Sequence, residues 1–511
     1  MRFSRDRRGQ SVVVGTVVLF GFLIVALAVY QVQVVPTENA DVEFEHSQAV
    51  EGDFVDLRNS ILTTGQTGDA RSTSLKLGTR YPSRTFFVNP PPVRGSLSTT
   101  EPRTLRVTNV TVDADGNAGA YWANRTNGTR SISFDTRSLR YSPEYNELRD
   151  GADLVYEQSL VLAEFDDAVL GRTGQTAVRS ERNRIQLTAL GGELSASGID
   201  RRSVDPEPLS PSRRSLALNT TGGPLVIEVP TDVPADKADG LRSAWERRLG
   251  DAARNVTVSA GTVRIELDSS ESYRLALGKV GVGTGAAAPN ESDGYLTRVS
   301  ASDAAAVVEV RDRFNNPVDG ATVRVNVSGN VSTLRTDDDG RASITPEGSP
   351  RVEMSINGGS ESWETVAFRA GTVGSGANDD NINPAGEGQI ALNDVGLNGN
   401  SVLRYQFVNQ GTEDREFREI EFTLSYRPQG NTRDTFTITG PGTRSQQVDL
   451  RGGFQELDEP ITIPAGERLT VEFTFQNNVR GDLIGISFED DLNRRALYIS
   501  PAEGSIDQPD G

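Results

Sequence analysis

The chain has 511 residues, no Cys, one His and a formal net charge of −19, from 71 acidic and 52 basic residues. The lack of Cys excludes disulfides, thiol nucleophiles, Fe–S clusters and Cys-ligated zinc, and a single His excludes paired-His metal sites. The acidic excess argues against nucleic-acid binding, which needs a basic surface. A chain of this length favours roughly three domains of about 100–200 residues each.

The first forty residues hold the strongest pattern. A basic leader, 1–9, contains four Arg, and no charged residue occurs from Gln10 to Thr37. The apolar run Ser11–Tyr30 is long enough to cross a bilayer core of about 30 Å as a helix. We expect a transmembrane helix over 10–36 that ends at Pro36. The positions of the Arg residues predict a single-pass protein of the cell membrane, with a cytoplasmic N-terminus and a large extracellular domain.

The junction Arg8–Ser11 resembles the class III signal peptide of archaeal type IV pilin-like proteins. In that family a prepilin peptidase cuts after a Gly between the basic leader and the apolar helix. The resemblance therefore implies a processing site formed by Arg8, Gly9 and Gln10, with cleavage after Gly9. Many pilins carry Glu five residues past the cut, where this chain has Val14. An uncleaved anchor and a protein released by cleavage after Ala28 remain alternatives.

The composition resembles that of haloarchaeal proteins. Only three of the 52 basic residues are Lys, and this bias coincides with the acidic excess and the absence of Cys. A high net charge keeps a protein soluble, and concentrated salt screens its self-repulsion because the Debye length is about 3 Å at 1 M. The resemblance implies a salt-rich environment.

After the apolar run, the spacing of hydrophobic residues predicts a helix over Asp41–Thr64. The apolar residues recur at steps of four, three and four, which places them on one face of a helix. They are Val50, Phe54, Leu57 and Ile61. The single His, His46, lies in this segment among acidic residues, and we expect it to be a solvated surface side chain.

The rest of 37–295 predicts mainly strands, because apolar and polar residues alternate in short runs. A second helix is expected over Asp236–Leu249, and Pro206–Ser212 and Gly281–Gly294 are expected to be linkers. These signals divide the region into a membrane-proximal helix plus β-rich part, 37–210, and an α+β part, 211–295. The expected strands include Ser74–Leu77, Thr85–Val88, Thr104–Val112, Ser131–Phe134, Asp153–Tyr156, Arg184–Leu187, Leu225–Val229, Val256–Val258, Thr262–Leu267 and Tyr273–Val280.

Two β-sandwich modules are predicted at 303–370 and 389–500, since alternating segments and turns succeed one another at short spacing. The first, through Ala306–Val327 and Thr336–Ile344, resembles bacterial Ig-like (Big-1) and carboxypeptidase-regulatory-like modules. That resemblance implies a spacer or adhesion unit without chemistry of its own. A polar break is expected at Asn378–Gly388 and a disordered tail at 501–511.

The predicted fold class is thus mainly β with an α+β part. It comprises a single N-terminal transmembrane helix, a membrane-proximal α+β region and two C-terminal Ig-like β-sandwich modules. Three acidic clusters, Asp113–Asn117, Asp337–Gly340 and Glu489–Asp491, are interpreted as turns or acidic surface, because their spacing lacks the remaining ligands of a calcium loop.

No motif predicts a catalytic, cofactor-binding or metal-binding residue. Eight N-x-[ST] sequons offer candidates for N-glycosylation, a modification that is common on archaeal surface proteins. They begin at Asn109, Asn124, Asn127, Asn219, Asn255, Asn290, Asn326 and Asn330.

The sequence therefore favours a non-enzymatic, membrane-anchored cell-surface protein that presents β-sandwich modules for adhesion or envelope interaction. We expect contact with the lipid bilayer through Ser11–Val35, a surface or envelope protein or glycan as partner, and no cofactor and no nucleic acid. Leu403–Ile499, which has no sequon, is the expected distal contact region. One alternative is a minor type IV pilin-like filament subunit, with the prepilin peptidase and pilin subunits as partners. Another is a surface hydrolase or solute-binding protein.

Overall fold

The chain folds into two compact units in this computed structural model. The first comprises 1–112 and 125–289, and the second comprises 113–124 and 290–511. The division after Pro289 falls within the linker expected at 281–294. The residues that the structure describes are 8–114, 116–126, 130–179, 183–247, 249, 253–259, 261–269, 271–301, 306–344, 351–369, 390–409, 414–426, 435–441, 444–450, 454–491 and 495–502.

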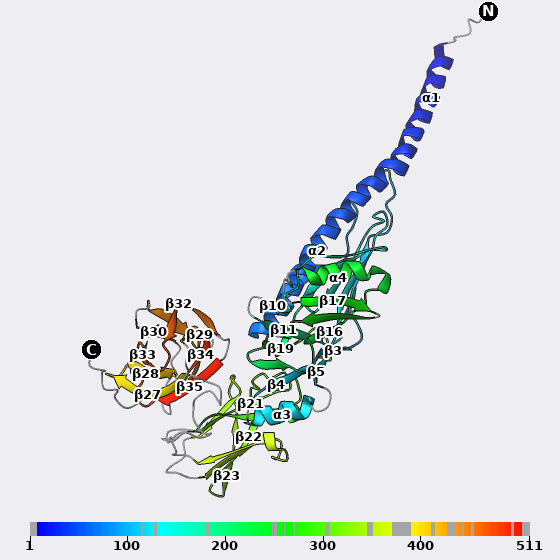
Figure 1. Cartoon of the computed structure of the whole chain (residues 1–511). Helices are drawn as coiled ribbons and strands as arrows, with labels where there is room; N and C mark the ends of the chain where they lie inside the picture. Colours follow the sequence, from blue (N-terminus) through cyan, green and yellow to red (C-terminus); the bar gives the residue numbers. More distant parts are fainter. Residues whose placement is uncertain are drawn as a thin grey trace, which may run out of the picture. The chain divides into compact units, whose positions relative to one another are not determined.

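The architecture is mainly β with one long N-terminal helix, which confirms the predicted fold class (Figure 1). The α-helices are α1 (Arg8–Val29), α2 (Val35–Thr67), α3 (Gly116–Thr126) and α4 (Ala238–Glu246). A π-helical turn, η1 (Tyr30–Val34), joins α1 to α2, and short 3₁₀ turns occur at η3 (Ala235–Lys237), η5 (Glu291–Asp293) and η6 (Ser362–Glu364).

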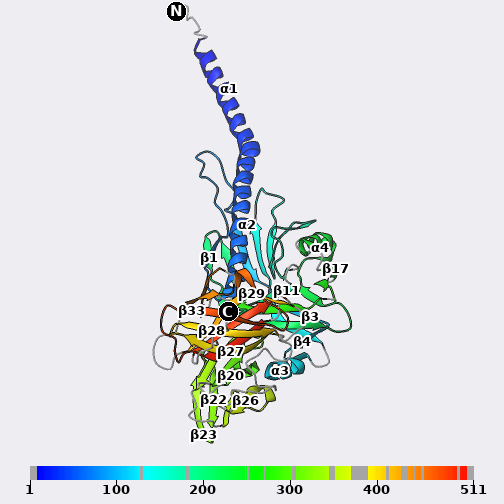
Figure 2. The same ribbon diagram turned by 60° about the vertical axis from the view of Figure 1, so that its left-hand side comes forward.

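In the first unit, α2 packs along antiparallel sheets (Figure 2). Its strands are β1 (Thr73–Lys76), β2 (Arg94–Thr99), β3 (Arg103–Thr108), β4 (Val110–Asp113), β5 (Ser131–Thr136), β6 (Leu139–Glu144), β7 (Asp153–Glu157), β8 (Leu160–Glu164), β9 (Val169–Gly171), β10 (Val178–Arg179), β11 (Arg184–Gly191), β12 (Ser195–Gly198), β13 (Arg201–Val204), β14 (Glu207–Ser210), β15 (Ser215–Thr220), β16 (Val226–Pro230), β17 (Ala253–Ser259), β18 (Thr262–Leu267) and β19 (Tyr273–Gly281). They pair in the orders β12-β2-β6-β7-β8-β9, β17-β18-β16-β3-β5 and β10-β11-β19-β15-β4, with β14 also on β19 and with β1 on β13. Strands β11 and β19 pair in parallel over Arg184–Gly191.

The predicted apolar stripe forms the centre of this unit. Val50, Phe54, Leu57 and Ile61 are all buried, and they share one hydrophobic core with side chains of the surrounding strands, including Leu75, Leu97, Tyr141 and Val161. Burial of a helix face against a sheet supplies most of the stability of such a helix. The helix predicted over Asp236–Leu249 is also present as α4, with Leu241 and Trp245 buried.

The predicted division at 210/211 is wrong, because strands on either side of it share sheets. β11 pairs with β19 over Arg184–Gly191, and β3 pairs with β16 through Val107 and Ile227. These shared sheets make 37–112 and 125–289 parts of one unit. Local composition marked a loop there but carried no information on which strands pair.

Two local predictions are also wrong. Pro206–Ser212 contains strand β14, which pairs with β19 through a register shift between Pro208 and Ser210, an irregular position of the kind that tolerates proline. Thr85–Val88 is a loop and not a strand. The three prolines that follow it have no N–H to donate to a neighbouring strand. The backbone of Val88 forms hydrogen bonds with the side chain of Gln31 instead.

The second unit contains two β-sandwiches. The first has sheets β20-β21-β24 and β23-β22-β25-β26, whose buried side chains form one core. Its strands are β20 (Tyr295–Ala301), β21 (Ala306–Arg311), β22 (Thr322–Val327), β23 (Asn330–Arg335), β24 (Arg341–Ile344), β25 (Arg351–Ser355) and β26 (Thr365–Arg369). The module therefore begins before the predicted residue 303.

Helix α3 adds a feature that the sequence did not predict. Most of it belongs to the second unit, although it lies far upstream in the chain. The Asn117 side chain donates to the carbonyls of Leu296 (2.8 Å) and Thr365 (2.9 Å), and Tyr121 stacks on Tyr295 with ring centroids 4.4 Å apart. The predicted acidic turn at Asp113–Asn117 is thus partly the start of a docked helix.

The second sandwich has sheets β27-β28-β33-β30-β31 and β32-β29-β34-β35. Aromatic rings from both sheets meet in its core, where Phe407 contacts Phe417 and Tyr498 at centroid distances of 5.1 and 4.9 Å. The predicted polar break Asn378–Gly388 and residues 503–511 of the predicted tail lie outside the described residues. The prediction that the tail begins at 501 is wrong, because Pro501 belongs to a strand and Ala502 is buried. The strands are β27 (Ile390–Asn398), β28 (Val402–Asn409), β29 (Arg415–Tyr426), β30 (Thr435–Thr439), β31 (Gln446–Asp449), β32 (Gln455–Ile463), β33 (Arg468–Thr474), β34 (Leu483–Asp490) and β35 (Arg495–Pro501).

Candidate functional site

The apolar helix and the helix of the globular unit are continuous. The sequence predicted that Pro36 ends the first helix, but Pro36 lies in the first turn of α2. In the preceding π turn, the Val35 N–H donates to the carbonyl of Tyr30, five residues back. A π turn widens the helix and shifts its hydrogen-bond register, so the proline ring and its missing donor are accommodated.

The buried face of α2 continues toward α1 with polar residues. Upstream of the apolar stripe, Asn39, Glu43 and His46 are buried at the same helical spacing of four and three residues. The spacing of apolar residues alone does not predict these polar positions. Extending the 3.6-residue period upstream from Val50 is the signal that would have found them.

Glu43 is the best-satisfied carboxylate of this face. It is fully buried and accepts hydrogen bonds from the backbone N–H groups of Asn146 (2.9 Å), Glu147 (2.9 Å) and Leu148 (2.6 Å) and from the Tyr81 hydroxyl. Charge-assisted hydrogen bonds of this kind are roughly twice as strong as neutral ones. Glu43 therefore ties the helix to two separate loops of the first unit.

The prediction that His46 is a solvated surface side chain is wrong, because His46 is only 4% exposed. Its Nε2 lies 3.0 Å from the Lys76 carbonyl, and its Nδ1 lies 3.0 Å from the Tyr145 hydroxyl. A carbonyl can only accept, so Nε2 carries the proton and the neutral ring accepts from Tyr145 at Nδ1. Burial lowers the pKa of His46, which favours this neutral form.

A loop, Tyr81–Pro92, is fastened to the junction between the two helices. The Gln31 amide donates to the Val88 carbonyl and accepts from the Val88 N–H, both at 3.0 Å. Phe87 stacks on Tyr30 with ring centroids 4.6 Å apart. Arg84 donates to Glu38 and Asn39 at 2.8 Å each. These contacts hold the loop where the apolar run ends.

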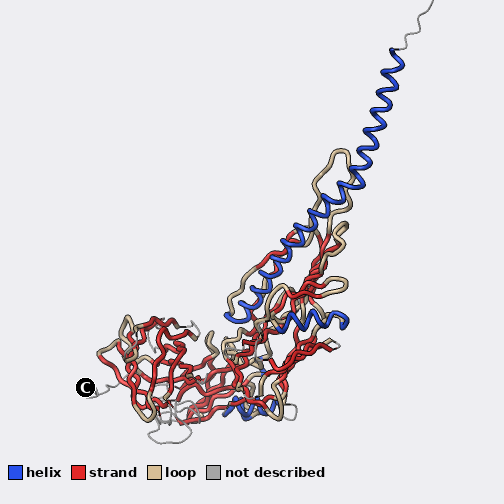
Figure 3. Tube along the Cα trace, turned by 45° about the horizontal axis from the view of Figure 1, so that its top comes forward, coloured by secondary structure: helices blue, strands red, loops and turns tan. Residues whose placement is uncertain are grey.

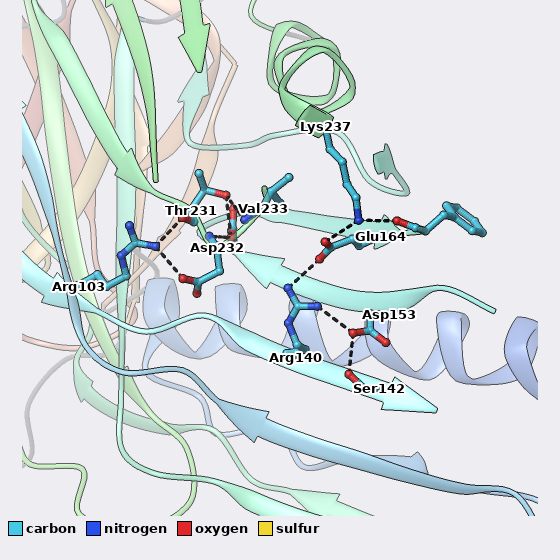
Figure 4. Close-up of polar contacts among 11 residues, drawn as sticks. Arg103, Arg140, Ser142, Asp153, Glu164, Thr231, Asp232, Val233 and Lys237 are labelled. Atoms are coloured by element: carbon cyan, nitrogen blue, oxygen red, sulfur yellow. Dashed lines mark hydrogen bonds and ion pairs between the residues drawn. The ribbon is translucent and has the colours of Figure 1, made fainter. Parts of the chain in front are cut away.

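A second polar cluster crosses neighbouring strands of the first unit (Figure 4). Arg140 on β6 donates to Asp153 on β7 (2.8 Å) and to Glu164 on β8 (2.7 Å), and Lys237 donates to Glu164 (2.9 Å). The two cations neutralise the carboxylates and join the sheet to the turn before α4. Their hydrogen bonds lower the pKa of Glu164 against the opposing effect of burial. Carboxylates that are neutralised by shared cations, as Asp153 and Glu164 are, are suited to holding strands together.

One carboxylate near this cluster lacks a cationic partner among the described ion pairs. Glu157, at the end of β7, is 1% exposed and accepts from the Asp232 N–H (3.0 Å) and the Thr231 hydroxyl (3.1 Å). Arg103 instead pairs with Asp232 at 2.7 Å (Figure 4). Burial raises the pKa of Glu157 to about 7. The raised pKa makes Glu157 a source of pH-dependent stability.

The structure places the processing residues at the start of α1. Arg8, Gly9 and Gln10 lie in its first turn, and residues 1–7 lie outside the described part. Among the described residues, one helix is long and apolar enough to cross a membrane, and its apolar segment is not buried in the protein. Exposed side chains such as Leu19, Phe20 and Phe22 cover this segment. The helix is compatible with a single-pass anchor.

The sequon asparagines differ in their surroundings. The Asn109 amide donates to the Pro224 carbonyl at 2.9 Å, and the Asn326 side chain accepts from the Gly329 N–H at 2.9 Å, so both side chains take part in local structure. Asn127 lies outside the described residues. The exposed candidates are Asn124, Asn219, Asn255, Asn290 and Asn330.

The acidic cluster Asp337–Gly340 forms a turn, as predicted. The prediction for Glu489–Asp491 is wrong in its first two residues, because Glu489 and Asp490 are buried in strand β34 and belong neither to a turn nor to an acidic surface. The Asp337 carboxylate accepts from the N–H groups of Asp339 (3.0 Å) and Arg341 (2.9 Å), and Gly340 adopts the positive φ of 71° that this turn requires. In the described part of the chain, no group of three or more His, Cys, Asp or Glu side chains is arranged to hold a metal ion.

No family model matches the chain. An uncharacterized protein from Archaeoglobus fulgidus is 22% identical over 431 residues, which cover 80% of this chain and 68% of that protein. Among solved structures, the Yersinia pseudotuberculosis adhesin InvE is 12% identical with a TM-score of 0.16, over 42% of this chain and 59% of that one. Escherichia coli alpha-2-macroglobulin is 8% identical with a TM-score of 0.13, over 86% of this chain and 43% of that one. This chain thus spans less than two thirds of either solved chain. TM-scores this low do not establish a shared fold.

Proposed function

We propose that the chain is a non-enzymatic, membrane-anchored cell-surface protein whose β-sandwiches are presented outside the cell for adhesion or envelope interaction. The observation that carries this proposal is the single helix from Arg8 to Thr67, which is apolar and exposed in its first part and buried in the first unit in its second. A helix shared by anchor and globular core transmits force without a flexible linker. That property suits a protein that holds modules away from a membrane.

The charge pattern supports the proposed orientation. Four Arg precede the apolar segment, and cationic residues next to a membrane span remain on the cytoplasmic side. Everything after the span would then face the outside. The acidic surface of that part, in a chain with a net charge of −19, fits an exported protein in concentrated salt.

Surface labelling tests the proposal. Val331 is 52% exposed on β23, and the chain has no Cys, so Val331→Cys introduces a single accessible thiol. We expect a membrane-impermeant maleimide to label this variant on intact cells as fully as after lysis. The unsubstituted chain, which has no thiol, gives the background. Labelling only after lysis would overturn the proposed orientation and location.

A minor type IV pilin-like subunit is the second candidate. The same observation favours it, since an exposed apolar helix that continues into a globular unit can pack against other such helices as well as against lipid. In this case the resemblance of Arg8–Ser11 to a class III signal peptide implies processing. The helix that would enter a filament is then Gln10–Val35.

The mature N-terminus separates these candidates. Mass spectrometry of the membrane-associated protein should show a first residue Gln10 if a prepilin peptidase has acted. A terminus at Met1 would contradict the pilin candidate and leave the plain anchor. A terminus at Val29, found in the medium, would contradict both, because the chain would have lost its span.

A further inference from the structure

The loop Tyr81–Pro92 carries two apolar side chains that no part of the first unit covers. Phe86 is 80% exposed and Val88 is 78% exposed, values above those of Leu19 (71%) and Phe22 (70%) on the apolar helix itself. A soluble surface rarely leaves neighbouring large side chains so open without a partner. The alternating pattern of Thr85–Val88, which predicted a strand, therefore has a role other than strand pairing.

The position of the loop relative to the helix is fixed by specific contacts. Gln31 holds the backbone of Val88, and Tyr30 stacks on Phe87, the residue between the two exposed ones. Tyr30 is the last residue of the apolar run, and from Val13 to Tyr30 the helix rises by roughly 26 Å. This length matches a bilayer core of about 30 Å, so Tyr30 falls at its edge. Figure 3 shows loops of this unit running back along the helix.

The segment around this loop differs in charge from the rest of the chain. From Ala70 to Thr100 the chain has no Asp or Glu, although acidic residues make up 71 of its 511 residues. The same segment contains Arg71, Lys76, Arg80, Arg84 and Arg94. The loop Tyr81–Pro92 itself has no acidic group to repel anionic lipid headgroups, and its one cation, Arg84, is paired with Glu38.

We propose that this loop inserts Phe86 and Val88 into the outer interface of the same bilayer that α1 crosses. This inference rests on the proposed membrane anchor. Aromatic side chains are favoured at the membrane interface, and Tyr30 and Phe87 would form a stacked pair there. The loop then serves as a second membrane contact, which fixes the tilt of the first unit on its helix. Its partner is lipid, because its exposed side chains continue the apolar surface of the span.

A depth measurement on the full chain tests this proposal. Phe86→Cys creates the only thiol of the protein, which can carry an NBD fluorophore in nanodiscs of equimolar phosphatidylcholine and phosphatidylglycerol. We expect lipids with a nitroxide near the headgroup to quench this fluorophore, and we expect aqueous iodide to quench it weakly. Both substituted positions below are exposed, so the variants should keep the fold.

The matched control is Phe44→Cys with the same fluorophore. Phe44 is 52% exposed on α2, and its fourteen-residue separation from Tyr30 places it about 20 Å further along the helix. Lipid nitroxide quenching should be severalfold stronger at position 86 than at position 44, and iodide quenching should show the reverse order. This order must hold in concentrated salt, where headgroup attraction is screened.

The possible failures are distinguishable. If the chain does not enter nanodiscs, the proposed membrane anchor itself fails. If it enters them and positions 86 and 44 are quenched alike, only the loop insertion is overturned. Protection of position 86 from iodide without quenching by lipid nitroxide would also overturn the insertion, and would indicate that a second copy of the chain covers the loop.

Discussion

Replacing Phe54 by Ala is expected to lower the free energy of unfolding of the first unit by about 3–5 kcal/mol. Phe54 is fully buried at the centre of the stripe that α2 presents to the strands. Truncation removes a phenyl ring that surrounding side chains such as Leu97 and Tyr141 cannot replace, and it leaves a cavity. The loss falls on the contact between the helix and the sheets, which is the contact that couples the apolar helix α1 to the globular unit.

Scanning calorimetry of the full chain measures this effect. For a unit of this size, a loss of that order lowers the transition midpoint by roughly 10 °C. The transition of the second unit should not move, and it serves as an internal reference. Phe44→Ala on the same helix, where the side chain is 52% exposed, should change the stability by less than about 0.5 kcal/mol. Equal effects of the two substitutions would show that α2 does not dock as described.

The sequence predicted those elements whose signal is local. The stripe from Val50 to Ile61, the apolar run of α1 and the alternating strands of both sandwiches follow from hydrophobic period alone. Each of these elements has one continuous apolar surface, which is either buried or exposed. The type of each element therefore follows from side chains that are neighbours in sequence.

The predictions that failed depended on distant partners. His46 was expected to be solvated because its neighbours in sequence are acidic, but Lys76 and Tyr145 enclose it. Thr85–Val88 alternates like a strand, yet no ladder is available and Gln31 takes the backbone bonds of Val88. The helical period can indicate that His46 lies on the buried face, but it does not identify distant partners such as Lys76 and Tyr145, which become visible only in the fold.

Glu157 makes the stability of the first unit depend on pH, and Glu157→Gln is expected to remove that dependence. Burial raises the pKa of this carboxyl from its ordinary value of 4.5 to about 7, although bonds from Asp232 and Thr231 oppose the shift. The second carboxylate oxygen, Oε2, has no hydrogen-bond partner in the described structure. An ionised Glu157 is therefore poorly solvated in the folded state.

The sign of the effect follows from proton linkage. Between pH 4.5 and 7 the folded state holds a proton on Glu157 that the unfolded state has lost, so this contribution to stability grows as the pH falls. As the pH rises through 7, the stabilising proton is lost and the contribution disappears. A shift of this size corresponds to about 3 kcal/mol between the two limits. Gln keeps the acceptor for Asp232 and Thr231 and carries no charge at any pH.

We therefore expect Glu157→Gln to raise the free energy of unfolding by about 2–3 kcal/mol at pH 9 and to have little effect at pH 5. The matched control is Glu164→Gln on the adjacent strand β8, where Arg140 and Lys237 lower the pKa of the carboxyl. Loss of that charge leaves two half-buried cations without their shared partner, so this variant should be destabilised above pH 5. The comparison uses the difference from the unsubstituted chain at each pH, which cancels the titration of His46. If Glu157→Gln were neutral or destabilising at pH 9, Glu157 would have to find a compensating cation or water in the folded protein.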